Sequence, residues 1–216
     1  MNSNYKVLKF ESKVLNEFDD QISIEEPLEI ILKYKDKKTW VEKTISITMR
    51  TPGHDEDLVR GFLFNERVIE QINHIDNIEL VGDPVGQYKL KNKAVATINN
   101  SENIDIDKIK RNFLTNSSCG VCGKTSLDSL EIIKKDKILR STPKINHEII
   151  MKSPLMLRQN QSEFAKTGGI HASGLFDKKG NVIALREDVG RHNALDKLIG
   201  SALKENLLDN SSQFLT

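Results

Sequence analysis

Alternation of apolar and polar positions predicts β-strands along much of the chain, because successive side chains of a strand point to opposite faces. The predicted strands cover residues 5–10, 28–34, 39–49, 79–81, 88–98, 171–177 and 182–188. Short polar turns separate two pairs of these strands, which predicts one hairpin over residues 28–49 and another over residues 171–188. In the first hairpin, the alternation predicts that Ile45, Ile47 and Met49 share one buried face.

Apolar residues at helical spacing predict five helices between and after these strands. The predicted helices cover residues 55–69, 104–114, 126–135, 148–163 and 191–207. Asp55 is predicted to cap the first. The last carries a predicted core face of Leu195, Leu198, Ile199, Ala202 and Leu203. Mixed α/β is therefore the predicted fold class. Residues 1–100 are expected to form a β-rich N-terminal lobe with one helix, and residues 101–216 an α/β C-terminal lobe, unless both belong to one continuous domain.

Composition narrows the classes of protein to which this chain could belong. The 216 residues include 32 basic and 31 acidic side chains, so bulk charge gives no reason to expect binding to nucleic acid or to a membrane. No stretch reaches the roughly 18 apolar residues of a membrane span, and the first 13 residues lack the apolar core of a secretory signal. We therefore expect a cytoplasmic protein with reduced thiols. Two cysteines are too few for a disulfide scaffold.

Both cysteines lie in one C-x-x-C segment, Cys119 to Cys122, with glycines at positions 120 and 123 and Lys124 after them. This spacing suits a disulfide, a shared metal or sulfur transfer, and the small neighbours and positive charge favour an open thiolate. A zinc site needs two further ligands in a tight pair, and the five histidines include no such pair. A thioredoxin-like motif belongs at a first strand–helix junction, whereas this pair follows a predicted helix. A loop that holds two incidental cysteines is the remaining interpretation.

Paired glycines precede a histidine in the segment Gly168, Gly169 and His171, at the start of a predicted strand. Glycines let backbone N–H groups approach a ligand closely. The histidine would act as a base, donate a hydrogen bond to an anion, or serve the structure alone. A deaminase is excluded because Ser173 stands where that chemistry needs a glutamate, and because the cysteine pair precedes the histidine and follows Ser118 instead of a proline.

The start of the last predicted helix is rich in groups that attract anions. Gly190 permits a sharp entry into the helix, and Arg191 and His192 join the first helical N–H groups and the positive end of the helix dipole. These groups predict a site for a phosphate or pyrophosphate that also includes Asn193. Asp196 follows His192 by four residues and is predicted to hold its imidazole ring. The alternative is a charged, solvated first turn.

Together these segments resemble the formate dehydrogenase accessory sulfurtransferase family, FdhD. Four blocks carry the resemblance: Thr51-Pro52 followed by Gly61-Phe62-Leu63-Phe64 and Glu66; Cys119-Gly120-Val121-Cys122-Gly123; Thr167-Gly168-Gly169-Ile170-His171; and Glu187-Asp188-Val189-Gly190-Arg191-His192-Asn193-Ala194-Leu195-Asp196-Lys197. The match runs from about Leu28 to Leu207. It implies a cytidine-deaminase-like α/β fold, a mixed sheet flanked by helices, without zinc.

The resemblance also implies a function as a sulfur carrier, that is, a sulfurtransferase. A cysteine desulfurase would load a persulfide onto Cys119, with Cys122 as an assisting thiol. The sulfur would then pass to the bis(molybdopterin guanine dinucleotide) molybdenum cofactor, on which formate dehydrogenase depends. A homodimer is implied as well. We expect the cofactor phosphates to meet Gly168, Gly169, His171, Gly190, Arg191, His192 and Asn193. The alternatives are a cofactor-binding chaperone without catalysis and an inactive fragment.

Two departures from the family pattern carry expectations of their own. Arg67 stands where a glycine usually follows Glu66, which is expected to change a helix end. The chain stops in residues 213–216, a run that looks like the start of another strand, whereas family members continue with further strands and helices. We expect those C-terminal elements to be missing, and the resulting open sheet edge to lower stability.

Overall fold

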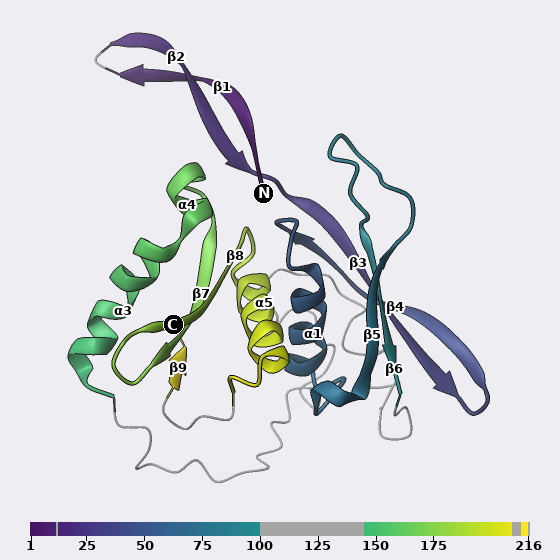
Figure 1. Cartoon of the computed structure of the whole chain (residues 1–216). Coiled ribbons are helices and arrows are strands. Elements are labelled where there is room, and N and C mark those ends of the chain that lie inside the picture. The colour runs from purple at the N-terminus through teal and green to yellow at the C-terminus, as the bar shows by residue number, and fades with distance from the viewer. Residues whose placement is uncertain (12, 100–144, 209–212, 216) are drawn as a thin grey trace, which may run out of the picture.

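The computed structural model describes residues 1–11, 13–99, 145–208 and 213–215 of the chain (Figure 1). Its elements are β1 (Asn2–Glu11), β2 (Val14–Ser23), β3 (Glu26–Asp36), β4 (Thr39–Arg50), α1 (Asp55–Asn65), the 3-10 helix η1 (Ile72–His74), β5 (Ile75–Val81), β6 (Lys93–Ile98), α3 (His147–Asn160), α4 (Ser162–Thr167), β7 (His171–Asp177), β8 (Val182–Asp188), α5 (Arg191–Lys204) and β9 (Gln213–Leu215). The helices predicted over residues 104–114 and 126–135 lie outside the described residues. The division into two lobes near residue 100 stays a prediction.

A four-stranded sheet in the order β4-β3-β6-β5 holds the larger core. Strand β3 pairs antiparallel with β4 and parallel with β6, and β5 pairs antiparallel with β6, so the predicted mixed sheet is confirmed. Along β3, Leu28, Ile30 and Leu32 are buried at alternate positions. They pack with Leu58 and Leu63 of α1, which covers this face of the sheet.

A β-bulge in β4 corrects the prediction for its buried face. Residues Ile30 and Ile31 of β3 pair with Ser46 and Thr44, so Ile45 is an extra residue in the ladder. An extra residue reverses the alternation beyond it, because side chains in a strand repeat every two residues. Ile45 is therefore buried, but the next two apolar positions, 47 and 49, are exposed.

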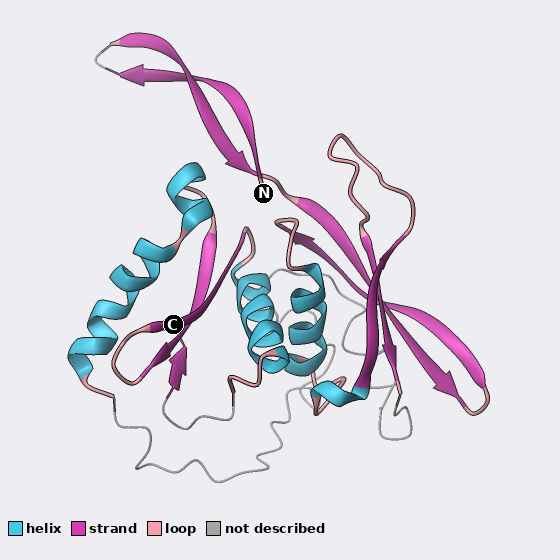
Figure 2. Ribbon diagram, in the orientation of Figure 1, coloured by secondary structure: helices cyan, strands magenta, loops and turns pink. Residues whose placement is uncertain are grey.

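The smaller sheet has the order β8-β7-β9, with all neighbours antiparallel. The hairpin predicted over residues 171–188 is confirmed, and so is the strand that begins at residue 213. Helix α5 packs on one side of β7 and β8, with Leu175, Leu198 and Ala202 as the buried centre. Figure 2 shows α3 and α4 on the other side of this hairpin.

Helices α1 and α5 run antiparallel between the two sheets and join them (Figure 1). Their backbones approach so closely that a Cβ atom on Gly61 would overlap the carbonyl oxygen of Asp196. A Cβ atom on Gly200 would overlap the carbonyl oxygen of Asp57 in the same way. Glycine is the residue that permits such a close crossing.

The ends of α1 differ from the predicted ones. His54, and not Asp55, is the N-cap residue, and it adopts a left-handed φ of 55°. The helix ends at Asn65 instead of continuing to position 69, because Arg67 takes a φ of 57°. The Val68 N–H then donates to the carbonyl of Leu63, which is the hydrogen bond of a Schellman motif. Arg67 thus takes the left-handed position that glycine usually occupies in this motif, and a changed helix end stays a prediction.

The hairpin of β1 and β2 projects away from both sheets (Figure 1). The sequence alternation predicted part of β1 but did not predict β2. Seven large apolar residues of the hairpin are exposed: Tyr5, Leu8, Phe10, Val14, Leu15, Phe18 and Ile22. At its base, the Met1 amino group lies 3.3 Å from the Glu163 carboxylate of α4, and the Ser23 hydroxyl donates to that of Thr167.

Candidate functional site at the β7–β8 hairpin and the start of α5

The pairing of β7 with β8 brings the predicted glycine–histidine segment beside the predicted anion site. His171 opens β7 and pairs with Asp188, the last residue of β8. Gly168 ends α4 with a φ of 67°, and Gly190 is the N-cap residue of α5. The described site residues therefore lie at one end of this hairpin: Gly168, Gly169, His171, Gly190, Arg191, His192 and Asn193.

The start of α5 presents groups that attract an anion. The first hydrogen bond of the helix runs from the Ala194 N–H to the Gly190 carbonyl, so the N–H groups of residues 191–193 have no helical acceptor. Among the described residues, no side chain caps this end. Arg191 and His192 are exposed beside it, and so is His171. This arrangement suits a phosphate group chemically.

The Asn193 side chain is buried and hydrogen-bonded within the protein, whereas Arg191, His192 and His171 are exposed. Its amide Nδ2 donates to the carbonyl of Met49 at 2.6 Å and to the Asp188 carboxylate at 3.2 Å, and its Oδ1 accepts from the Thr48 hydroxyl. The side chain is buried, so these contacts occupy it. Any contact of Asn193 with a ligand would come from its backbone N–H.

A buried ion pair that sequence reasoning did not identify holds this end of α5 in place. The Lys197 ammonium lies 2.6 Å from the Asp188 carboxylate, and both side chains are almost fully buried. Lys197 also donates to the Thr51 carbonyl, while the Thr51 and Gly190 N–H groups donate to Asp188. The pair thus ties the turn before α1 to the turn before α5. Asp188 and Lys197 lie in one sequence block, but their shared partner Thr51 is far away along the chain, so no local sequence pattern reveals the contact.

Glu187 holds the start of α4, the short helix that ends at Gly168. Its carboxylate accepts hydrogen bonds from the N–H groups of Glu163 and Phe164, at the start of α4. A carboxylate is favourable there because it satisfies free N–H groups at the positive end of a helix. Since Gly168 ends this short helix, Glu187 links the position of Gly168 to β8.

Asp196 does not take the role predicted for it. Its carboxylate accepts a hydrogen bond from Asn65 at the end of α1 instead of lying against the ring of His192. Burial between the two helices raises the pKa of Asp196 to about 7, against the opposing effect of the Asn65 hydrogen bond. The residue therefore belongs to the contact between α1 and α5.

Cys119 and Cys122, the predicted sulfur-carrying residues, lie outside the described residues. Within the described part of the chain, no helix combines the length and apolar character that a membrane crossing requires.

Comparison with known proteins identifies the family. A family model described as the FdhD/NarQ family matches residues 23–216. The chain belongs to the FdhD/NarQ family. A sulfur carrier protein FdhD from Sulfolobus acidocaldarius is 39% identical over 191 residues, which cover 88% of this chain and 65% of that protein. A sulfur carrier protein FdhD from Picrophilus torridus is 42% identical over 189 residues, covering 87% and 66%. The chain thus spans about two thirds of the length of these relatives.

A solved structure shares the fold with this FdhD/NarQ family member. It is that of a protein described as a formate dehydrogenase accessory protein, from Desulfotalea psychrophila. The two superpose with a TM-score of 0.62 and 20% sequence identity, over all of this chain and 74% of the other. The predicted mixed α/β fold class is confirmed.

Proposed function

We propose that this protein is a sulfur carrier in the maturation of formate dehydrogenase. The observation that carries the proposal is its identity of about 40% to sulfur carrier proteins of the FdhD family over nearly nine tenths of the chain. The C-x-x-C segment supports it, because two thiols with glycine neighbours and a following lysine suit sulfur transfer. The reaction would take place in the cytoplasm, where thiols stay reduced.

In the first step, the Cys119 thiolate attacks the terminal sulfur of a persulfide on a cysteine desulfurase. The S–S bond of the donor breaks, its electron pair leaves with the cysteine thiolate of the desulfurase, and Cys119 becomes a persulfide. In the second step, the Cys122 thiolate attacks the inner sulfur of Cys119. A disulfide forms between the two residues, and hydrosulfide leaves for the molybdenum cofactor. Cellular thiols then reduce the disulfide.

The molybdenum cofactor is the sulfur-accepting substrate in this proposal, in its bis(molybdopterin guanine dinucleotide) form. Its phosphates would meet the N–H groups at the start of α5, with Arg191, His192 and His171 as charged or polar partners. The glycine pair at positions 168 and 169 leaves room for close backbone contacts. Support comes from the exposure of these side chains at one end of the β7–β8 hairpin. We further propose a homodimer, by resemblance to the family.

Mass spectrometry of the peptide that contains both cysteines tests the first step. After incubation with a cysteine desulfurase and cysteine, without reductant, we expect one added sulfur atom on Cys119 that dithiothreitol removes. Cys122→Ser is the matched control, because it should still gain the sulfur and lose only its release as hydrosulfide. A Cys119→Ala variant that matures formate dehydrogenase fully in cells would refute the assignment.

Binding of GDP, as a probe for the nucleotide part of the cofactor, tests the second site. We expect Arg191→Ala to weaken GDP binding about tenfold, since a charge-assisted contact to phosphate is lost. Lys178→Ala is the control, because Lys178 is also exposed but lies in the turn between β7 and β8, at the other end of the hairpin. Equal affinities of the two variants would contradict a phosphate site at the start of α5.

A further inference from the structure

Helix α4, which ends at Gly168 of the proposed cofactor site, is a short helix without a buried residue. Its six residues lie outside both hydrophobic cores, beside the base of the β1–β2 hairpin. A helix of this length is not stable in water by itself. Polar contacts at its two ends are therefore the main restraints on the position of α4 and of the glycine pair at positions 168 and 169.

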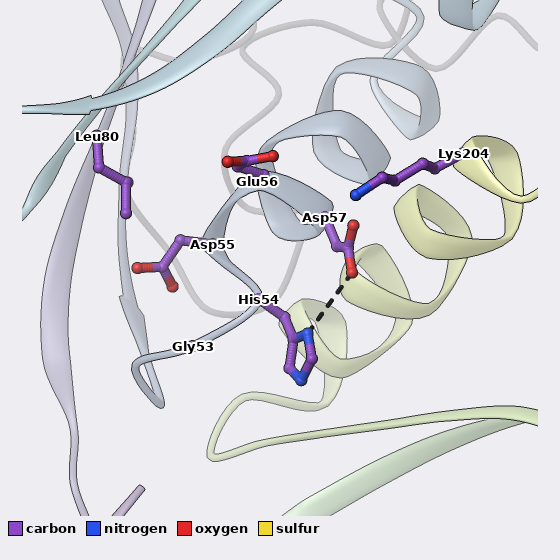
Figure 3. A pocket seen from close by; sticks show the side chains of 7 residues that line it. All are labelled: Gly53, His54, Asp55, Glu56, Asp57, Leu80 and Lys204. Atoms are coloured by element: carbon purple, nitrogen blue, oxygen red, sulfur yellow. Dashed lines mark ion pairs between the residues drawn. The ribbon is translucent and has the colours of Figure 1, made fainter.

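Strand β8 is the fixed support at the start of α4. Its Arg186 donates to the Ser201 hydroxyl of α5 at 2.6 Å and lies 3.2 Å from the Asp57 carboxylate of α1. Figure 3 shows this carboxylate in a cavity of about 310 Å³ between the start of α1 and the end of α5. Glu187, the next residue of β8, points to the other side of the strand and accepts from two N–H groups at the start of α4, at 3.0 and 2.9 Å. The start of α4 is thus tied to a strand that α1 and α5 hold.

The base of the β1–β2 hairpin holds the other end of α4. The Ser23 hydroxyl donates to the Thr167 hydroxyl at 3.0 Å, and Thr167 donates in turn to the Glu163 carbonyl at 2.9 Å. Ser23 is itself fixed, because it pairs with Asn2 at the base of the hairpin ladder. Since Thr167 immediately precedes Gly168, this contact reaches within one residue of the glycine pair.

A second contact of the hairpin base reaches α4 through the Glu163 side chain. Its carboxylate accepts from the Asn2 amide at 3.1 Å and lies 3.3 Å from the Met1 ammonium group. Although partial burial raises the pKa of Glu163, the Asn2 hydrogen bond and the Met1 charge lower it below its ordinary value. The carboxylate is therefore charged at pH 7, and both of its contacts to the hairpin are assisted by that charge.

We propose that the base of the β1–β2 hairpin positions the glycine pair for phosphate binding, with Ser23 and Thr167 as the positioning residues. The inference rests on the proposed cofactor site. Glycine has more backbone conformations available than any other residue, so a pair of glycines needs an outside restraint to hold one arrangement. The fixed end of α4 supplies that restraint before the ligand arrives. Without it, a smaller fraction of the molecules is ready to bind, and the apparent affinity falls by that fraction.

Hydrogen exchange at the Gly168 amide, measured by NMR on the intact chain, tests the positioning without any ligand. This N–H donates to the Phe164 carbonyl at 2.8 Å, so it exchanges when the end of α4 opens. We expect Ser23→Ala and Thr167→Val each to accelerate the exchange about fivefold, because each removes the hydrogen bond between the two hydroxyls. Thr167→Ser keeps a hydroxyl and should exchange at the wild-type rate. An unchanged rate in Ser23→Ala would overturn the proposal.

Calorimetry with GDP tests the consequence for the site in the same variants. We expect Ser23→Ala and Thr167→Val each to weaken GDP binding about fivefold, and Thr167→Ser to restore the wild-type affinity. The double variant should bind no more weakly than Thr167→Val alone, because both changes remove one shared contact. Thr97→Val is the matched control, since Thr97 is also partly exposed but lies in β6 of the other sheet. Additive losses in the double variant would contradict a role through this contact.

The outcomes separate this inference from the proposed function. GDP binding that Arg191→Ala weakens but Ser23→Ala leaves unchanged would overturn the inference and keep the cofactor site. A wild-type chain that binds no GDP would contradict the cofactor site and overturn the inference with it. We expect the urea midpoint of Ser23→Ala to match that of the wild type, because α4 adds no residue to either hydrophobic core. A clearly lower midpoint would assign the contact to general stability and overturn the positioning role.

Discussion

Lys197 and Asp188 are the pair of residues on which the candidate cofactor site depends most. Each is almost fully buried. Lys197 donates to the Thr51 carbonyl in the turn before α1, and Asp188 accepts from the N–H groups of Thr51 and of Gly190, in the turn before α5. A buried charge without its partner is costly, because the protein interior replaces hydration poorly. The pair therefore fixes where the exposed groups at the start of α5 lie.

Removal of the Lys197 charge should destabilise the fold strongly. In Lys197→Met the Asp188 carboxylate stays buried without its cation, so we expect a loss of about 3–5 kcal/mol in the free energy of unfolding. Urea denaturation at pH 7 measures it. Lys178→Met, at an exposed position, should change the same quantity by less than about 0.5 kcal/mol. Similar stabilities of the two variants would show that the buried pair contributes little.

Asp196 should make stability depend on pH near neutrality. Its folded pKa of about 7 lies above the ordinary value of 3.8, so the folded state holds this proton more tightly than the unfolded state. The stability contribution is complete below about pH 4 and is lost as pH rises to 7, by about 2–4 kcal/mol.

Asp196→Asn removes this titration while the amide oxygen still accepts from Asn65. We expect the free energy of unfolding of the variant, relative to that of the wild type, to increase between pH 4 and pH 7. Urea denaturation at several pH values measures this difference. Asp83→Asn, in an exposed turn, is the control. Parallel stability curves for wild type and Asp196→Asn would contradict the raised pKa.

Among the elements, β4 shows how one local irregularity redirects a whole set of side chains. The bulge at Ile45 turns Thr48 and Arg50 toward the interior, where Thr48 bonds to Asn193 and Arg50 pairs with Asp55. Without the extra residue these polar groups would face solvent, and Ile47 would take their side. The alternation predicted the strand correctly but predicted the wrong face for its second half.

The crossing of α1 and α5 should be intolerant of any side chain at its glycines. Gly61→Ala would place a methyl group against the Asp196 carbonyl, and the two backbones would have to separate. We expect a loss of about 2–4 kcal/mol in thermal or urea unfolding. Gly169→Ala is the matched control, because a Cβ atom there meets ordinary van der Waals contact only. If Gly61→Ala lowered the free energy of unfolding no more than Gly169→Ala does, the two helices would be shown to separate at little energetic cost.

On the scale of the whole molecule, the β1–β2 hairpin contributes little to either core. Its apolar residues are mostly exposed, and its ties to the body are a few polar contacts at its base. Deletion of residues 1–22 should therefore change the free energy of unfolding by less than about 2 kcal/mol. The deletion should also reduce self-association, because exposed apolar side chains on a two-stranded hairpin promote contacts between molecules. Light scattering measures this self-association. Loss of cooperative unfolding would contradict this view.

The sequence by itself determined the fold class, most element positions and the segments that we propose carry the chemistry. Period-two and helical patterns are local, so β3, β4, α1, the β7–β8 hairpin and α5 were predicted within a few residues. The glycine–histidine segment and the start of α5 were also found by local composition. Strand β2, which lies outside any core, was missed because solvent contact leaves its pattern weak.

Only the tertiary structure decided which of these segments meet and which of their residues serve the structure. The pairing of His171 with Asp188 depends on strand register. The ion pair of Lys197 with Asp188 joins α5 to the end of β8, and Lys197 also bonds to Thr51, which is far away in the sequence. Tertiary hydrogen bonds also occupy two predicted site residues: the Asn193 side chain donates to the Met49 carbonyl, and the Asp196 carboxylate accepts from Asn65. Long-range contacts of this kind are set by how the elements pack, and packing is a property of the whole chain that no local pattern encodes.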